Sequence, residues 1–113
     1  MGRRVTALPL FVYGSLRRGG THHAELRGAE FLGAASTAPK YALTALGEYP
    51  ALVPGAESIP GELYAASPSL LAELDAFEGE AYLRTPILLS NGARALAYLL
   101  APGEDGETPW PST

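Results

Sequence analysis

The 113-residue chain is long enough to bury one hydrophobic core, and its 47% hydrophobic and 18% charged residues argue against disorder. A formal net charge of −4 argues against nucleic-acid binding, and no apolar run approaches the roughly 20 residues that span a bilayer. The absence of cysteine excludes disulfides and thiolate chemistry. We expect one cytoplasmic domain over residues 1–113, with a core at about 7–101 and a tail at 102–113 whose Trp110 is a candidate to fold back, and neither membrane nor nucleic-acid partners.

The first two thirds of the chain predict short strands joined by turns. An apolar run from Leu8 to Tyr13 is typical of a buried strand, and it breaks at a glycine turn. Residues 21–27 predict a short helix, with Thr21 as N-cap and Gly28 as the stop signal. Further strands are expected at 31–37, 40–46, 51–53 and 59–65, with a turn at 48–50 before the third of these.

The clearest helix is predicted over residues 68–78. Ser67 is a favoured N-cap residue, Pro68 suits the first helical position, and Gly79 favours termination. Asn91-Gly92 is a strong hairpin signal. The two strands that it joins are expected at 82–89 and 93–101.

The turn after the first strand has polar and glycine residues that suggest several kinds of site. Its glycine spacing is that of a nucleotide P-loop, but Gly20 stands where the lysine should be. Ser15 lacks the G-x-S-x-G context, and His22 and His23 lie too near it in sequence for an attractive triad. Adjacent histidines diverge on a helix, so no metal site is expected and both are predicted at the surface. A strand running into such a turn is a common anion or carbonyl site, although an ordinary turn has the same pattern.

One carboxylate falls on the apolar side of the predicted helix. The apolar residues of this helix form one stripe: Leu70, Leu71, Leu74 and Phe77. At about 100° per residue, Glu78 falls inside the arc of that stripe. A buried carboxylate needs partners or a function, and burial raises its pKa toward the range useful for proton transfer. If the helix ended earlier, Glu78 would lie in water, and Glu80 would be the rival candidate for the functional carboxylate.

Five short motifs occur together over residues 9 to 100. They are 11–17 (FVYGSLR), 49–53 (YPALV), 61–64 (GELY), 74–79 (LDAFEG) and 82–84 (YLR). In this order and at these distances they resemble the γ-glutamylcyclotransferase-like family, also called AIG2-like or BtrG-like. The resemblance implies an α+β fold, a small mixed β-barrel with flanking short helices. It also implies a cofactor-free and metal-free enzyme that releases 5-oxoproline and a free amine from a small-molecule γ-glutamyl amide.

The resemblance also implies roles for individual residues. Glu78 would be the catalytic acid and base, and the turn Tyr13-Gly14-Ser15-Leu16 would hold the glutamyl end of the substrate. Tyr82 would line the cavity, and Arg84 of the same segment would be a further substrate contact. Two alternatives stay open: a non-catalytic protein that binds a γ-glutamyl or other small acidic ligand, and an amidase that releases open-chain glutamate.

Overall fold

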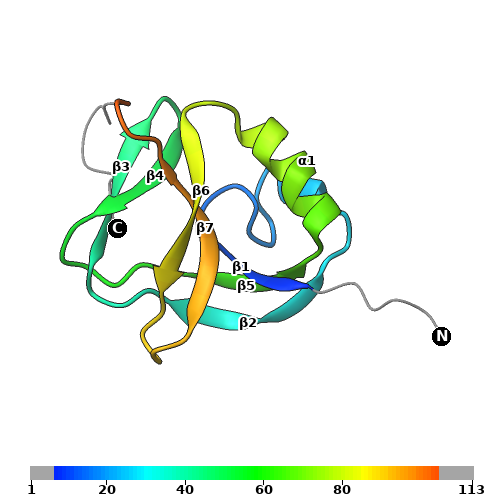
Figure 1. The fold of residues 1–113 in the computed structure, drawn as a ribbon, viewed down its shortest axis with the longest axis horizontal. Helices are drawn as coiled ribbons and strands as arrows, with labels where there is room; N and C mark the ends of the chain where they lie inside the picture. Colours follow the sequence, from blue (N-terminus) through cyan, green and yellow to red (C-terminus); the bar gives the residue numbers. More distant parts are fainter. Residues whose placement is uncertain (1–6, 105–113) are drawn as a thin grey trace.

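Seven strands, one α-helix and one short 3₁₀ helix make up residues 7–104, the part of the chain that the computed structural model describes (Figure 1). In chain order these are β1 (Leu8–Val12), η1 (His23–Leu26), β2 (Glu30–Ser36), β3 (Tyr41–Leu46), β4 (Tyr49–Pro54), β5 (Pro60–Ala66), α1 (Pro68–Glu78), β6 (Tyr82–Leu88) and β7 (Arg94–Leu100). Neither helix of this part is long and apolar enough to cross a membrane. The predicted tail beyond residue 104, with Trp110, lies outside the described residues.

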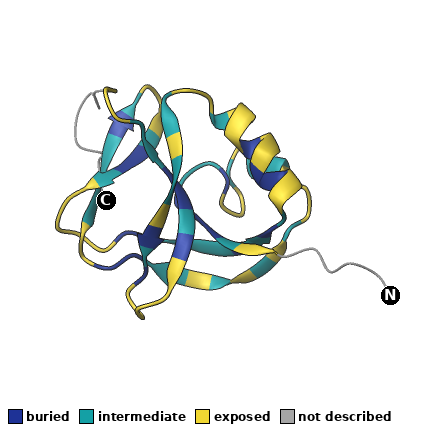
Figure 2. Ribbon diagram, in the orientation of Figure 1, coloured by how far each residue is buried: buried dark blue, intermediate teal, exposed yellow. Residues whose placement is uncertain are grey.

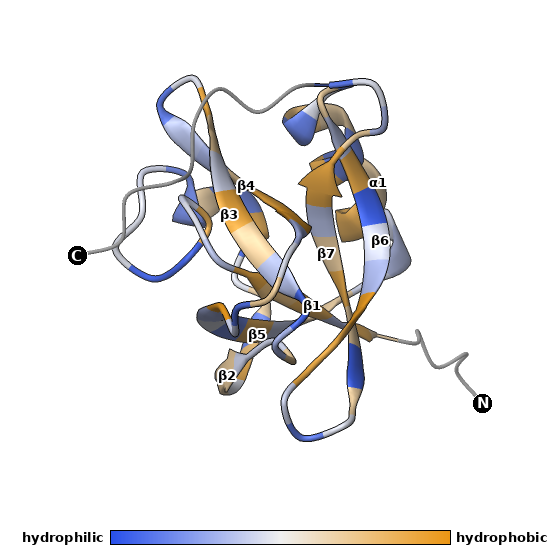
Figure 3. Ribbon diagram, turned by 90° about the vertical axis from the view of Figure 1, so that its left-hand side faces the viewer, coloured by the Kyte–Doolittle hydropathy of each residue, from blue (hydrophilic) through white to orange (hydrophobic). Residues whose placement is uncertain are grey.

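The strands form one mixed sheet that forks at β7. Strand β7 pairs with β6 along one edge, antiparallel from Tyr82↔Leu100 to Leu88↔Arg94. Along its other edge it pairs in parallel first with β1, at Leu10↔Leu96, and then with β4, at Leu52↔Leu99. One arm of the sheet therefore continues from β1 to β5 and β2, and the other continues from β4 to β3. Figure 3 shows β3 and β4 on one side, β6 and β7 on the other, and β1, β5 and β2 below them.

The predicted α+β class is confirmed, but the predicted barrel is wrong in one respect. The sheet does not close, because within residues 7–104 no pairing joins β2 at one end of the strand order to β3 at the other. The far end of the β2 arm still meets the β6–β7 hairpin: Thr37, directly after β2, forms an isolated antiparallel bridge with Leu89, directly after β6. A single bridge, and not a continuous ladder, joins the sheet there.

Local sequence signals explain the best-predicted elements. Helix α1 has the predicted bounds; the Ser67 hydroxyl accepts a hydrogen bond from the Leu70 amide at 3.1 Å, and Gly79 ends the helix with a φ of 78°. The β6–β7 hairpin also forms where predicted, with the Asn91 side chain accepting from the Ala93 amide at 2.9 Å. Gly92 in this turn has a φ of 88°, a conformation that glycine adopts without strain.

Two predicted boundaries are wrong. Tyr49 and Pro50, expected in a turn, open β4, because Gly47 at a φ of 62° lets residues 47–48 alone connect it to β3. Thr21 is not the N-cap of the 3₁₀ helix. His22 occupies that position, and its side chain bonds to Ser15 instead of capping the helix. The chain does leave this helix at the predicted stop, but Arg27 already takes the left-handed conformation.

Strand β1 is buried on both faces and separates two hydrophobic clusters. Leu10 and Val12 pack on the side of α1, with the helix residues Leu70, Leu71 and Leu74. Phe11 and Tyr13 point the other way, among residues of β4 and the β6–β7 hairpin. Figure 2 shows the buried residues along β1 and on the inner side of α1, with exposed residues on the outer side of the helix. The strand that leads into the glycine turn is thus held from both sides.

Gly61→Ala should destabilise the protein. A Cβ atom at this position of β5 would lie 2.4 Å from the Val12 carbonyl oxygen and 2.6 Å from the Phe11 ring, so the core would have to shift. Such overpacking costs about 1 to 3 kcal/mol of unfolding free energy, measurable by urea denaturation. Ser58→Ala, in the exposed loop before β5, is the control and should change stability by less than about 0.5 kcal/mol. Equal stability of the two variants would contradict the close approach of β1 and β5.

Candidate active site

A cavity of about 180 Å³ lies where the end of β1, the start of β4 and the end of α1 come together. It brings together six of the seven predicted site residues: Tyr13, Gly14, Ser15, Leu16, Glu78 and Tyr82. The remaining lining residues are Phe11, Val12, His22, Tyr49, Pro50, Phe77 and Tyr98. Among residues 7–104, Glu78 is the sole carboxylate of this lining, His22 is its sole histidine, and neither lysine nor arginine belongs to it.

The hydroxyl of Tyr13 connects three strands at the fork of the sheet. It donates a hydrogen bond to the Tyr98 carbonyl of β7 and accepts one from the Leu52 amide of β4 at 3.0 Å. The side chain is buried, and this burial raises the pKa of Tyr13 well above the ordinary value for tyrosine. Tyr13 therefore lines the cavity with its ring, while its hydroxyl is fully used in holding β4 and β7 together.

The turn that follows β1 is held by its own hydrogen bonds. The Arg17 amide donates to the Gly14 carbonyl at 3.1 Å, and the His22 amide donates to the Ser15 carbonyl at 3.0 Å. Gly20 is required here, because a Cβ atom would lie 2.2 Å from the Ser15 carbonyl oxygen. Within residues 7–104 the backbone amides of Ser15 and Leu16 have no hydrogen-bond partner, although both residues line the cavity. Two free amides beside a cavity can bind an anion or a carbonyl oxygen.

The prediction that both histidines lie at the surface is wrong, since both side chains are half-buried and tied to this turn. His22 Nδ1 lies 2.9 Å from the Ser15 hydroxyl, and His23 Nδ1 donates to the Leu16 carbonyl at 2.9 Å. His22 also lines the cavity. Sequence reasoning missed this role because it placed the two residues on a regular helix, whereas the chain folds back so that residue 22 meets residue 15.

Glu78 ends helix α1 and lines the cavity. The helix positions it as predicted, at an intermediate level of exposure, while Glu80 beyond the helix end is exposed and outside the lining. Within residues 7–104 the Glu78 carboxylate has no hydrogen bond or ion pair. Burial alone raises the pKa of Glu78 from 4.5 to about 7. At neutral pH this carboxyl is therefore populated in both protonation states, as proton transfer requires.

Tyr82 fixes the start of β6 to the start of β4. Its hydroxyl donates to the Pro50 carbonyl at 3.0 Å, which joins two segments that both line the cavity. Burial, followed by the negative charge of Glu78, raises the pKa of Tyr82 to about 12. Tyr82 therefore stays neutral across the physiological range and presents a polar but uncharged wall beside the carboxylate.

The expectation that Arg84 contacts a ligand in the cavity is not supported by its position. Arg84 does not line the cavity; its guanidinium lies 3.5 Å from the Asp75 carboxylate of helix α1. The same Asp75 carboxylate accepts a hydrogen bond from the Tyr98 hydroxyl at 2.6 Å. Arg84 thus pairs with Asp75 and not with Glu78, which lies one helical turn further on and has no ion pair within residues 7–104.

Phe77 also differs from the sequence-based expectation. It was predicted in the core stripe of the helix, but its side chain is 40% exposed and lines the cavity. Its ring centroid lies 5.1 Å from that of His22, in an edge-on arrangement. The turn after β1 thus supplies a packing partner that the helix pattern alone does not reveal.

Comparison with known proteins shows the family of this chain. Residues 10–113 match the model of the family described as gamma-glutamyl cyclotransferase, AIG2-like, and the chain belongs to this family. It is 46% identical over 69 residues to a protein of Vibrio cholerae and 43% identical over 67 residues to the gamma-glutamylcyclotransferase family protein YtfP of Escherichia coli K12. These matches cover 61% and 59% of this chain, and 60% and 58% of the two relatives.

The fold also matches a solved structure of the same family name. The crystal structure of a mouse AIG2-like protein superposes with a TM-score of 0.71 at 25% sequence identity, over 93% of this chain and 88% of that chain. The family resemblance that the five motifs predict is therefore confirmed.

Tyr13→Phe should destabilise the fold more than the loss of an exposed tyrosine hydroxyl does. The variant leaves the Leu52 amide and the Tyr98 carbonyl without their buried partner, at a cost of about 1 to 3 kcal/mol in unfolding free energy. Tyr49→Phe is the matched control, because Tyr49 is exposed and its hydroxyl makes no hydrogen bond within residues 7–104. Equal denaturation midpoints for the two variants would show that the Tyr13 hydroxyl does not hold the fork.

Glu78→Gln should alter the pH dependence of stability. Because folding raises the pKa of Glu78 from 4.5 to about 7, the wild-type protein should lose stability relative to this variant as pH rises through that window. The difference in unfolding free energy should grow by about 2 to 3 kcal/mol between pH 4 and pH 8. Urea denaturation of both proteins at several pH values measures it, and a difference that stays constant with pH would refute the raised pKa.

Proposed function

We propose that this protein is a γ-glutamyl cyclotransferase with Glu78 as its general acid and base. The observation that carries the proposal is the unpaired carboxylate of Glu78, with a pKa of about 7, in a small cavity that it shares with the turn of residues 13–16. The cavity supplies a proton carrier and free backbone amides but no cysteine nucleophile. A reaction in which the substrate provides its own nucleophile suits this set of groups.

In this reaction the substrate's α-amino group attacks its own γ-carbonyl carbon. Glu78 first accepts a proton from the α-ammonium group, and the freed amine forms the C–N bond of a five-membered ring. Collapse of the tetrahedral intermediate breaks the bond to the amide nitrogen, which receives the proton from Glu78. The second proton of the attacking nitrogen leaves through the same carboxylate, so the products are 5-oxoproline and the amine as its ammonium ion.

The turn after β1 would hold the glutamyl part of the substrate for this attack. With no lysine or arginine in the lining that residues 7–104 form, the amides of Ser15 and Leu16 are the groups suited to the α-carboxylate or to the oxyanion that develops on the γ-carbonyl. A folded-back substrate held in this way gains the advantage of an intramolecular reaction. The protein's contribution is then mostly position and proton transfer.

Incubation with a panel of γ-glutamyl amino acids and γ-glutamyl amines should yield 5-oxoproline. Glu78→Gln should lower kcat/KM by about 100-fold to 10,000-fold, because it removes the proton carrier and keeps the side-chain shape. Glu80→Gln, a nearby exposed carboxylate outside the cavity lining, is the matched control and should stay within about twofold of wild type. Full activity of Glu78→Gln would refute the mechanism.

Two other outcomes of the same assay have defined meanings. Absence of product with every member of the panel would favour a non-catalytic protein that binds a γ-glutamyl ligand. Open-chain glutamate in place of 5-oxoproline would indicate hydrolysis by water. Chromatographic separation of glutamate from 5-oxoproline distinguishes these outcomes.

A further inference from the structure

Three aromatic rings from three separate segments meet beside the cavity. His22 belongs to the turn before η1, Tyr49 opens β4, and Phe77 lies in the last turn of α1. The His22 ring lies between the other two, with centroid distances of 5.4 Å to Tyr49 and 5.1 Å to Phe77. All three line the cavity, and we call this set the aromatic rim.

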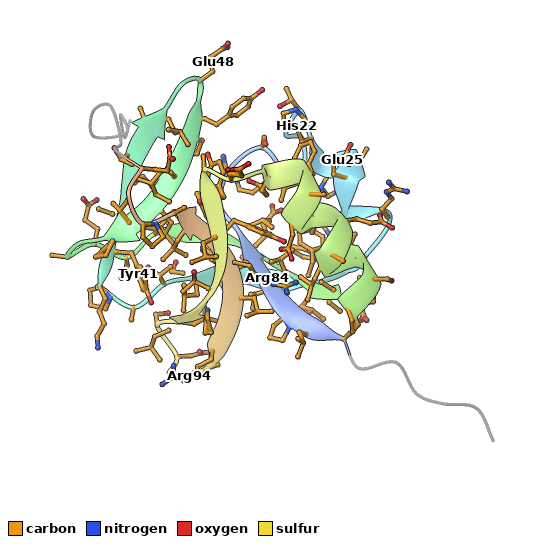
Figure 4. All side chains as sticks on the ribbon, turned by 45° about the horizontal axis from the view of Figure 1, so that its top comes forward. His22, Glu25, Tyr41, Glu48, Arg84 and Arg94 are labelled. Carbon is orange, nitrogen blue, oxygen red and sulfur yellow. The ribbon has the colours of Figure 1, made fainter. Side chains whose placement is uncertain are left out.

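The aromatic rim lies on the solvent side of the cavity. Tyr49 and Phe77 are 42% and 40% exposed, whereas the lining residues Phe11, Val12 and Tyr98 are buried. Single exposed aromatics need no explanation, but two that converge on one histidine at the edge of a cavity form a continuous apolar surface. Figure 4 shows His22 beside helix α1 and Glu48 pointing away at the tip of the β3–β4 hairpin, next to Tyr49 in sequence.

Each residue of the aromatic rim is connected directly to a polar group of the proposed site. Phe77 precedes Glu78, and the His22 ring nitrogen lies 2.9 Å from the Ser15 hydroxyl. Tyr49 precedes Pro50, whose carbonyl accepts from Tyr82. A ligand held between the turn and Glu78 therefore has the three rings as its immediate neighbours on the way to solvent.

The size of the cavity determines which part of a substrate reaches these rings. Its volume of about 180 Å³ is below the roughly 300 to 1,000 Å³ of sites that enclose a whole drug-sized ligand. A glutamyl group that occupies the interior leaves no room there for a bulky amine. The substituent on the amide nitrogen must then leave the interior past Glu78, which protonates that nitrogen, and lie against the aromatic rim.

We propose that the aromatic rim is the leaving-amine subsite and that it selects γ-glutamyl amides whose amine carries an aromatic or other apolar group. This inference rests on the proposed cyclotransferase function. Aromatic rings attract one another in edge-on and offset arrangements beyond the effect of area burial, and the rim offers two exposed rings for such contacts. A short amine such as methylamine would leave the rings in water and gain nothing from them.

The test compares γ-glutamyl benzylamide with γ-glutamyl methylamide, which share the reacting bond and differ in the group that reaches the rim. We expect kcat/KM for the benzylamide to be at least about tenfold higher. Tyr49→Ala and Phe77→Ala should each bring this ratio toward one. Leu32→Ala is the matched control: Leu32 is 48% exposed on β2, lies outside the cavity lining, and its loss should leave the ratio as in wild type.

A binding measurement separates failure of this inference from failure of the proposed function. Calorimetry with Glu78→Gln, which retains the rim, should show the benzylamide binding about tenfold more tightly than the methylamide even if no amide is turned over. A preference in binding that both rim variants lose, with no product from any member of the substrate panel, would refute the cyclotransferase activity and leave the aromatic rim as the site that contacts the amide substituent. Equal affinities, or a preference that both rim variants retain, would refute the subsite whatever the activity.

Discussion

The hydrogen bonds of the Tyr13 hydroxyl are the interaction on which the rest of the structure depends. At the fork of the sheet, one part of the β7 edge pairs with β1 and the next part pairs with β4. The hydrogen-bond ladder along this edge is interrupted between the two partners. Buried backbone groups at such a break need partners, and the hydroxyl provides them by donating to the Tyr98 carbonyl and accepting from the Leu52 amide. Tyr13, whose hydroxyl bonds these backbone groups, is also the first residue of the turn. The same residue therefore stabilises the sheet and lines the candidate site.

Two carboxylates of helix α1, three residues apart, have opposite environments. Asp75 accepts from the Tyr98 hydroxyl and pairs with Arg84 at 3.5 Å, whereas Glu78 has neither kind of partner within residues 7–104. Burial without compensation raises the pKa of Glu78 to about 7. Pairs of acidic groups whose surroundings differ in this way are a recurring feature of sites that transfer protons. Arg84 contributes to this difference because it is engaged by Asp75.

Features set by local sequence were predictable, and features set by contacts between distant segments were not. Ser67 and Gly79 define helix α1, and a 100° spacing then places Glu78 toward the cavity without any knowledge of the fold. The fork of the sheet depends on which strands share an edge of β7, which no local pattern encodes. The bond between His22 and Ser15 depends on a reversal of the chain that helical periodicity does not describe.

The internal hydrogen bonds of the turn have a consequence for ligand affinity. His22 contacts Ser15 through both its backbone amide and its ring, and His23 bonds to the Leu16 carbonyl. Gly20 leaves room for the Ser15 carbonyl, which a side chain would displace. The two free amides are therefore already in position before a ligand arrives. Ordering a loop when a ligand binds costs conformational entropy and weakens the net binding free energy. Here the turn is already ordered in the folded protein, so this cost does not arise on binding. A small ligand with few contacts can then be held without a closing lid, and its release does not wait for a segment to unfold.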